Sequence, residues 1–342
     1  LADAIAHYVG DTTLKLPENT PDFATIDRIL MVACGTAFLA CMTAKYWFER
    51  LAGIPVEVDI ASEFRYRTPP IGPNTLAIFV SQSGETADTL AALRHVATRA
   101  QILSVVNATE SSIARESDVV LPILAGAEIG VASTKAFTCQ LAVLLSLALK
   151  AGHDRGQLTD EALTAHARDL RALPGLVAQA LATNDAIAQV SQHLAKAQDI
   201  LFLGRGQMYP IALEGALKLK EISYIHAEGY ASGELKHGPI ALIDPTVPVI
   251  VMAPKDNLFD KTVSNMQEVM ARGGQVVLVT DRKGAHEAGE GTAHVIQMPE
   301  VPDELAPILY AIPAQLLAYH TAVAKGTDVD QPRNLAKSVT VE

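Results

Sequence analysis

The sequence predicts an α/β protein with two parallel sheets, each flanked by helices. Short runs of β-branched and apolar residues alternate with longer segments of helical period along most of the chain. This strand-then-helix order is typical of parallel sheets covered on both faces. The second half repeats the order of the first at an offset of about 170 residues, as expected for two copies of one fold. The length of 342 residues also suits two domains better than one.

Ten segments are predicted to be strands because each is short, apolar and followed by a turn. In the first half they are residues 28–33, 55–60, 75–80, 102–107 and 118–124, and in the second half 199–204, 225–227, 247–253, 275–280 and 293–298. Residues 160–196 are rich in Ala and Leu without a strand signal, so we expect helices there. We also expect a leading helix over 1–14 and a late helix over 306–325.

These elements predict five parts of the chain. They are a leading helical segment (1–24), the first copy (25–155), connecting helices (156–196), the second copy (197–325) and a tail (326–342). The tail is polar and aperiodic, which alone favours a frayed terminus. The chain begins with Leu1 rather than Met, and we interpret it as a fragment of a longer protein.

Composition excludes several classes of protein. With 49% hydrophobic and 19% charged residues, the chain can bury a large core, and disorder is not expected. A net charge of −11 argues against a nucleic-acid surface, so any anion must be bound locally by backbone N–H groups and hydroxyls. The longest apolar run, 141–149, is too short to span a membrane, and no signal-peptide pattern is visible, so neither a membrane span nor a signal peptide is expected.

The cysteines and the absence of ligand clusters limit the cofactor chemistry. Three cysteines without a CxxC pair indicate neither a disulfide framework nor a zinc site, and they fit a reducing cytoplasm. No cluster with metal-ligand spacing is visible, so no metal or organic cofactor is expected.

The strongest local motif is Val80-Ser81-Gln82-Ser83-Gly84-Glu85-Thr86, where a buried strand enters a turn of small residues and a helix begins at about Glu85. Free N–H groups at such a helix start favour an anion, and the side chains of Ser81, Gln82, Ser83 and Thr86 can donate further hydrogen bonds. The alternative is a simple helix cap by Ser83, with Thr86 in the first turn. A P-loop is excluded because the Gly-Lys-Ser/Thr ending is missing.

Two other glycine-containing turns follow predicted strands. Thr36, in Ala33-Cys34-Gly35-Thr36, ends the first strand and could add a hydroxyl to the same site, since ligands gather at the carboxyl ends of strands. The alternative is a tight turn in which Gly35 supplies a positive φ. Gly204-Arg205-Gly206 is a poor dinucleotide motif because Tyr209 stands where a third Gly is required.

Three further sites carry groups capable of proton transfer or covalent chemistry. Glu214, Lys218 and Glu221 are spaced to share one helix face, where two carboxylates around a lysine could tune a base or form an ordinary surface ion-pair stripe. His237 precedes Gly-Pro and is expected on a loop, as a proton carrier or an incidental surface residue. Lys337 in the tail can form a Schiff base if it lies in a pocket.

Taken together, these segments resemble the isomerase half of the glutamine–fructose-6-phosphate aminotransferases, also called glucosamine-6-phosphate synthases. That half is built from two sugar-isomerase (SIS) domains. The Ser-Gln-Ser-Gly-Glu-Thr motif is common to SIS proteins. Residues 128–135, 212–221, 234–239 and above all the tail 330–342 are more specific to the aminotransferases. The resemblance covers nearly the whole chain and implies two three-layer, flavodoxin-like domains with the tail over the active site.

The resemblance also implies roles for individual residues. Glu221 would move a proton between C1 and C2 of the sugar, His237 would assist ring opening from the partner subunit, and Lys337 would form the imine. The implied substrate-binding set is Thr36, Ser81, Gln82, Ser83, Thr86, Val131, Ser133, Glu214 and Ala336, with Lys218 beside the base. Ala37 departs from the family, which commonly has a further phosphate-binding Ser there. We expect a modest loss from this change, because one neutral hydrogen bond contributes about 0.5–1.5 kcal/mol.

The implied activity is the interconversion of fructose-6-phosphate and glucose-6-phosphate in a cytoplasmic homodimer. Glucosamine-6-phosphate would form with ammonia from a glutaminase domain that this chain does not contain. Two alternatives remain open: a free-standing amino-sugar-phosphate deaminase-isomerase, and a sugar-phosphate sensor without turnover. A purely structural scaffold is a third reading. Neither nucleic acid nor membrane is an expected partner.

Overall fold

The computed structural model describes residues 1–341. The chain divides into two compact units. Unit 1 contains residues 1–128, 133–172 and the tail from Ala336, and unit 2 contains residues 129–132 and 173–335. The fold class predicted from the sequence is confirmed, because each unit has one five-stranded sheet in which all pairings are parallel.

Unit 1 is built around a sheet of order β2-β1-β3-β4-β5. Its strands are β1 (Arg28–Ala33), β2 (Val56–Ile60), β3 (Thr75–Ser81), β4 (Gln101–Val106) and β5 (Val119–Pro122). Its helices are α1 (Ala2–Tyr8), α2 (Gly35–Trp47), α3 (Ala61–Phe64), α4 (Ala87–Val96), α5 (Ser112–Arg115) and α6 (Lys135–Asp154), with short segments η1 (Phe23–Thr25) and η2 (Phe48–Ala52). The helix α7 (Asp160–Leu181) begins in unit 1 and ends in unit 2.

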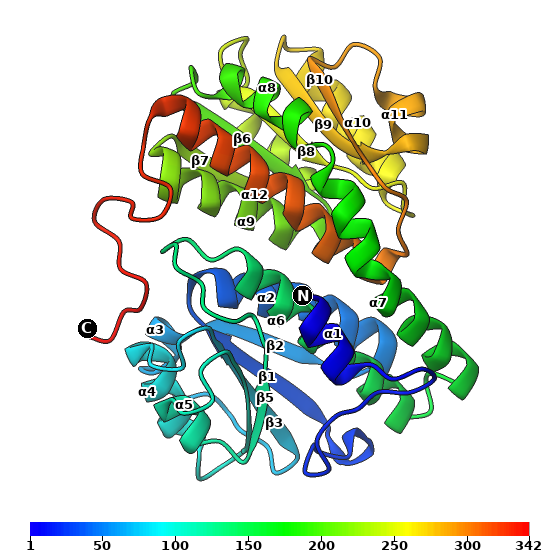
Figure 1. The fold of residues 1–342 in the computed structure, drawn as a ribbon, viewed down its shortest axis with the longest axis vertical. Helices are drawn as coiled ribbons and strands as arrows, with labels where there is room; N and C mark the ends of the chain where they lie inside the picture. Colours follow the sequence, from blue (N-terminus) through cyan, green and yellow to red (C-terminus); the bar gives the residue numbers. More distant parts are fainter. Residues whose placement is uncertain (342) are drawn as a thin grey trace. The chain divides into compact units, whose positions relative to one another are not determined.

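Helices cover both faces of this sheet. On one face α2 and α6 pack against the strands, and on the other α4 and α5 do so (Figure 1). Side chains that alternate between the two faces along each strand explain this arrangement. Leu30, Val32, Ala77 and Phe79 point into one apolar cluster together with Leu93 of α4. The residues between them on β1 and β3 are also buried, as expected for a parallel sheet covered on both sides.

Unit 2 repeats the same topology with its own elements. Its sheet has the order β10-β9-β8-β6-β7, which is the order of unit 1 read from the other edge. The strands are β6 (Asp199–Gly204), β7 (His226–Ala231), β8 (Pro248–Met252), β9 (Gln275–Asp281) and β10 (His294–Met298). The helices are α8 (Asn184–Leu194), α9 (Met208–Ser223), α10 (Phe259–Met270), α11 (Arg282–Ala288) and α12 (Ala306–Lys325), with η3 (Ser232–His237), η4 (Pro239–Leu242) and η5 (Asp303–Leu305).

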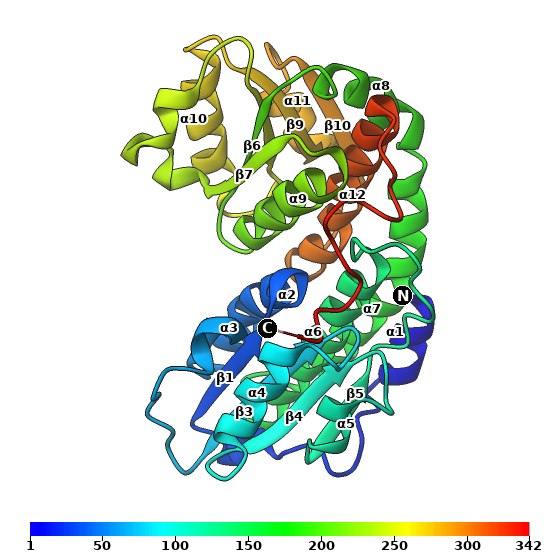
Figure 2. The same ribbon diagram turned by 90° about the vertical axis from the view of Figure 1, so that its left-hand side faces the viewer.

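The second sheet is also covered on both sides. Helices α9 and α12 pack together on one side of it, and α10 and α11 lie on the other (Figure 2). Its strand order, numbered within the unit, is 2-1-3-4-5, as in flavodoxin-like folds. The repeat inferred from the sequence is therefore a repeat of topology.

Several predicted boundaries need correction. The leading helix ends at Tyr8 rather than residue 14, because Gly10 begins a turn closed by its own N–H to the Thr13 carbonyl. The strand predicted over 225–227 spans His226–Ala231, since an edge strand tolerates its polar residues. Helix α4 begins at Ala87, two residues later than predicted. The three cysteines are free thiols, as expected.

One long helix is apolar enough to raise the question of a membrane. In the part of the chain that the structure describes, α6 alone is long and apolar enough to cross a membrane, but 89% of its apolar stretch is buried inside the protein. This burial is typical of a core helix.

Candidate functional site

A turn of hydroxylated residues lies at the carboxyl edge of the first sheet, between β1 and β3. These two strands are neighbours, and the chain leaves them toward opposite edges of the sheet. Such a switch point is where open α/β sheets bind ligands. The turns after the two strands carry Thr36 and the segment Ser81–Thr86. We call this region the cup.

Gly84 determines the shape of the turn. Its φ is +65°, and a Cβ atom at this position would lie 1.9 Å from the Ser111 hydroxyl. Only glycine allows both this backbone conformation and this close approach. The Gly84 carbonyl accepts a hydrogen bond from the Ile113 N–H at 3.0 Å, and the Ser112 N–H donates to the Glu85 carboxylate at 2.7 Å. The cup is therefore held by the first turn of α5. This attachment also explains why α4 begins only at Ala87.

The hydroxyl groups of the cup lie close together. The Ser81 and Thr86 hydroxyl oxygens are 3.2 Å apart, and Ser81 accepts a hydrogen bond from the Gly84 N–H at 3.0 Å. The Ser83 hydroxyl accepts from the Glu85 N–H at 3.2 Å. Thr86 is the N-cap of α4, but its side chain makes no capping hydrogen bond to the helix. The prediction that Ser83 caps this helix is therefore wrong, and its hydroxyl instead fixes the turn.

These residues line a cavity of about 120 Å³. This volume is about four times that of one water in the liquid, so a phosphate group can be accommodated. The lining residues are Cys34, Thr36, Ala37, Val80, Ser81, Gln82, Ser83, Thr86, Thr89, Ser133, Gln140 and Lys337. No carboxylate lines it within residues 1–341, whereas hydroxyls, amides and one amine do. The cavity is thus suited to an anion.

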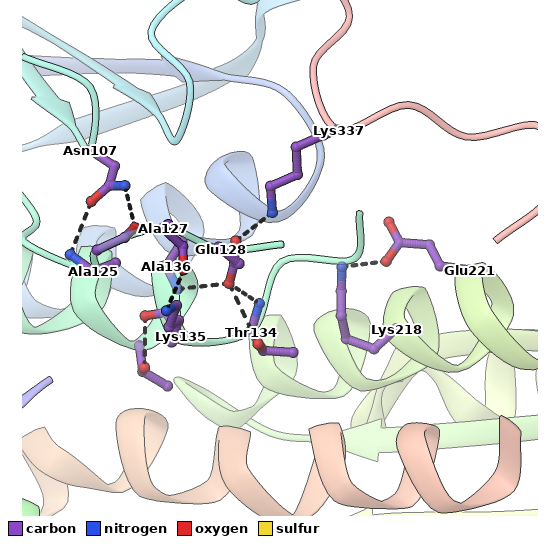
Figure 3. A network of polar contacts seen from close by, with 12 residues as sticks. Asn107, Ala125, Ala127, Glu128, Thr134, Lys135, Ala136, Lys218, Glu221 and Lys337 are labelled. Carbon is purple, nitrogen blue, oxygen red and sulfur yellow. Dashed lines mark hydrogen bonds and ion pairs between the residues drawn. The ribbon is translucent and has the colours of Figure 1, made fainter. Parts of the chain in front are cut away.

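Lys337 reaches the cup from the tail and is held there by Glu128. The Lys337 ammonium lies 2.7 Å from one carboxylate oxygen of Glu128, whose side chain is 5% exposed (Figure 3). The other oxygen accepts hydrogen bonds from the N–H groups of Thr134 and Ala136 at 2.9 and 3.2 Å. Burial opposes ionisation of Glu128, but the hydrogen bonds from Lys337, Thr134 and Ala136 together hold its pKa below the ordinary value.

The two residues after Lys337 attach the tail to the cup itself. The Ser338 hydroxyl is 3.0 Å from that of Ser83. The Val339 carbonyl accepts a hydrogen bond at 3.0 Å from the Ala87 N–H, in the first turn of α4. The tail therefore interacts with the same hydroxyl and helix start that would hold an anion. The frayed terminus suggested by its polar composition is not observed here.

Unit 2 contains a buried charged cluster on α9. The Lys218 ammonium contacts the Glu221 carboxylate (Figure 3) and lies 3.6 Å from that of Glu214. The side chains of Glu214 and Lys218 are 0% and 2% exposed, and that of Glu221 is 21% exposed. The predicted shared face is confirmed, but the surface-stripe interpretation is wrong. Buried charges of this kind persist only when they are paired, and they concentrate at functional sites.

The predicted site residues fall into two groups. Unit 1 holds Thr36, Ser81, Gln82, Ser83, Thr86, Ser133, Ala336 and Lys337, and unit 2 holds Val131, Glu214, Lys218, Glu221 and His237. The Val131 N–H donates to the Asp330 carbonyl at 2.9 Å. His237 is exposed at the end of η3, so it lies in a short helix rather than in a loop. The roles assigned to these residues from the sequence remain predictions.

Two residues of the cup region were missed from the sequence. Glu128 stands in a loop far from Lys337 along the chain, and Gln140 lies inside an apolar helix. A buried glutamine in such a helix is itself a signal, because it requires a partner. Within residues 1–341, no group of three or more His, Cys, Asp or Glu side chains could hold a metal ion.

Comparison with known proteins agrees with this architecture. The sequence pattern of the SIS domain matches residues 22–150 and 193–325. The glutamine–fructose-6-phosphate aminotransferase (isomerizing) of Bradyrhizobium diazoefficiens is 61% identical over 99% of this chain, and that of Brucella abortus is 58% identical over 100%. The chain spans 56% and 57% of the length of these two curated relatives.

Solved structures give the same grouping. The C-terminal domain of glucosamine-fructose-6-phosphate aminotransferase from Francisella tularensis is 45% identical, with a TM-score of 0.94 over 97% of this chain and 94% of that one. Glucosamine-6-phosphate deaminase from Thermotoga maritima is 26% identical, with a TM-score of 0.73 over 92% of this chain and 90% of that one. The chain, with its two repeated units, belongs to the SIS domain family.

Proposed function

We propose that this chain binds fructose-6-phosphate and isomerises it to glucose-6-phosphate, as the isomerase half of a glucosamine-6-phosphate synthase. The main support is the cup at the switch point of the first sheet: a cavity that, among residues 1–341, is lined by hydroxyls, amides and one lysine and by no carboxylate. The aminotransferase names of its 61% and 58% identical relatives support the same substrate.

The proposed mechanism uses side chains of the protein, the substrate and water. The cup holds the phosphate, so that binding energy orients the distant carbonyl end. Lys337, in its neutral form, adds to the C2 carbonyl of the open-chain ketose, and loss of water gives an imine at C2. In the parent protein ammonia would displace Lys337 from this imine and leave its own nitrogen on C2. Glu221 would then move a proton from C1 to C2, and the C1 hydroxyl would become the aldehyde of glucosamine-6-phosphate. Without ammonia, water returns the imine to the ketose and releases Lys337. Glu221 then removes a proton from C1 to give an enediol and returns it to C2, while the O1 proton passes to O2, which gives glucose-6-phosphate.

Further parts of the proposal concern partners. We expect a cytoplasmic homodimer in which His237 acts in the site of the partner subunit. In the parent protein a glutaminase domain would supply ammonia for glucosamine-6-phosphate. Glu214, Lys218 and Ala336 would line the site, and Val131 and Ser133 would contact the sugar hydroxyls.

The activity is tested with the 342-residue chain and fructose-6-phosphate, measuring glucose-6-phosphate formation. Glu221→Gln should lower kcat by about 10²- to 10⁴-fold with little change in the affinity for glucose-6-phosphate. Glu290→Gln is a matched control, because Glu290 is exposed in the same unit. If the unaltered chain binds the sugar phosphate without turnover, it is a sensor rather than an enzyme.

The dimer is tested by mixing two inactive variants. His237→Ala and Glu221→Gln chains, mixed and allowed to exchange subunits, should regain activity, because one site of each mixed dimer then has both groups intact. If each subunit uses its own histidine, the mixture stays inactive.

A deaminase-isomerase is the second candidate function. The observation that favours it is the similarity to the Thermotoga maritima glucosamine-6-phosphate deaminase, which covers 92% of this chain. Incubation with glucosamine-6-phosphate distinguishes the two, since a deaminase releases ammonia at a rate comparable with its isomerase turnover. The higher identity to the Francisella tularensis aminotransferase domain, 45% against 26%, favours the synthase.

A further inference from the structure

Gln140 is a buried polar side chain that lines the cup and has no assigned role. It is 1% exposed and lies in the second turn of α6 among apolar residues such as Leu141 and Val143. Its side-chain carbonyl oxygen has no hydrogen-bond partner in residues 1–341. A buried amide of this kind costs stability unless a partner satisfies it, and native proteins leave few such groups unpaired. The position therefore requires an explanation beyond packing.

The surroundings of Gln140 indicate what its partner is. It shares the cavity with Ser81, Ser83, Thr86 and Lys337, and no carboxylate lines this cavity in the described part of the chain. An anion is the ligand that these groups have in common. An amide has two N–H donors, and rotation by 180° about its terminal bond exchanges the nitrogen and the oxygen. This rotation puts the amide nitrogen in the place of the unpartnered oxygen, from which it can donate to an anion held in the cup, and moves the oxygen to the nitrogen position, which is not among the buried unpartnered atoms of residues 1–341.

We propose that Gln140 is a further binding residue of the cup and donates an amide hydrogen bond to the phosphate group of the substrate. The inference rests on the proposed function for the identity of the sugar phosphate, but the contact itself concerns only the phosphate. It adds a donor from α6 to those from the turn between β3 and α4. Two elements that line the cavity would then hold the same anion. The affinity for inorganic phosphate and that for fructose-6-phosphate should therefore depend on Gln140 to the same extent.

The test compares Gln140→Glu and Gln140→Leu with the unaltered chain. Glutamate has nearly the same shape but offers a negative oxygen, so it should weaken both inorganic phosphate and fructose-6-phosphate by more than about tenfold. Leucine removes the donor without adding charge and should weaken both by roughly tenfold. Gln101→Glu is the matched control, because Gln101 is exposed in the same unit and undergoes the same change of charge. Binding is measured by calorimetry, and folding by the thermal unfolding midpoint.

Each outcome separates this inference from the proposed function. Unchanged phosphate affinity in the folded Gln140→Glu and Gln140→Leu chains overturns the contact, even when the unaltered chain isomerises fructose-6-phosphate. Weaker fructose-6-phosphate binding with unchanged inorganic phosphate binding also overturns it, since Gln140 then contacts a sugar hydroxyl. If Gln140→Glu does not fold, the leucine variant and the shorter amide Gln140→Asn decide the question by the same comparison. A chain that binds phosphate through Gln140 but does not turn over fructose-6-phosphate contradicts only the proposed function.

Discussion

Replacing Glu128 by glutamine isolates the charge that holds Lys337 at the cup. The variant keeps an oxygen for the N–H groups of Thr134 and Ala136, but it removes the negative partner of the ammonium. At the observed separation of 2.7 Å, two unit charges attract by roughly 6 kcal/mol at an effective dielectric constant of about 20. Desolvation of a carboxylate that is 5% exposed offsets much of this gain.

The net effect on the tail should be that of one charged hydrogen bond. Such a bond contributes about 1.5–3 kcal/mol, which raises the population of the detached tail about 10- to 150-fold. The Ala87 amide reports this opening, because its hydrogen bond goes to the Val339 carbonyl. Hydrogen exchange at Ala87 should therefore accelerate by that factor in Glu128→Gln, while amides in the core strands stay unchanged.

A control variant shows whether the effect on the tail is specific to Glu128. Glu161→Gln removes an exposed carboxylate of the same unit and should leave exchange at Ala87 unchanged. If Glu128→Gln also leaves it unchanged, the ion pair does not anchor the tail and the argument is wrong. Borohydride trapping of the Lys337 imine with fructose-6-phosphate gives a second readout. A lysine that leaves the cup more often should be trapped more slowly.

Three further changes test the geometry. Gly84→Ala should lower the free energy of unfolding by about 2–5 kcal/mol, because alanine there has an unfavourable positive φ and also clashes with Ser111. Gly126 has the same φ of +65° but open space around it, so Gly126→Ala should lower this free energy only by the backbone strain of about 1–2 kcal/mol. Equal losses for the two variants in urea unfolding would contradict this. Lys218→Met should lower the free energy of unfolding by about 3–5 kcal/mol, because it leaves Glu214 and Glu221 without the positive charge between them. Lys220→Met is the control, since Lys220 is exposed on the same helix. The lowered pKa of Glu128 means that its contribution to holding the tail is complete above the ordinary value of 4.5 and is lost as the pH falls through its lower folded value. The protection of the Ala87 amide, measured relative to its intrinsic exchange rate at each pH, should therefore fall below about pH 4.5 unless Glu128 is replaced.

The sheets were predictable from the sequence because burial on both faces demands continuous apolar runs. β1 and β6 have the predicted bounds, β3 and β9 are one residue longer at their carboxyl ends, and β4 and β8 differ by one residue at both ends. Edge strand β7 shows where this signal fails, since Glu228, Gly229 and Tyr230 are polar or small and still pair with β6. The three-layer, flavodoxin-like arrangement followed from the repeated strand–helix pattern and the resemblance to SIS domains, whereas the strand order was read from the structure.

The candidate site was only partly predictable, and the reason is distance along the chain. The cup residues are local, so the motif after β3 pointed to them directly. Glu128 and Lys337 are separated by 209 positions, and no local pattern indicates that a loop carboxylate holds a tail amine. The start of α4 was also misplaced for a nonlocal reason, because the Glu85 side chain accepts a hydrogen bond from the Ser112 N–H at the start of α5.

The two units have the same topology, but within residues 1–341 their equivalent switch points carry different side chains. At the equivalent switch point of unit 2, between β6 and β8, the turn after β6 presents Arg205, which donates to the Asn265 side chain at 3.1 Å. Carboxylates stand nearby: Asp256, whose pKa is raised by burial, and Asp281, which accepts from the Lys255 N–H at 2.7 Å. A phosphate there would face negative groups rather than hydroxyls. Duplication therefore repeated the scaffold, and the difference in chemistry lies in the turns after equivalent strands and in the charges that α9 buries.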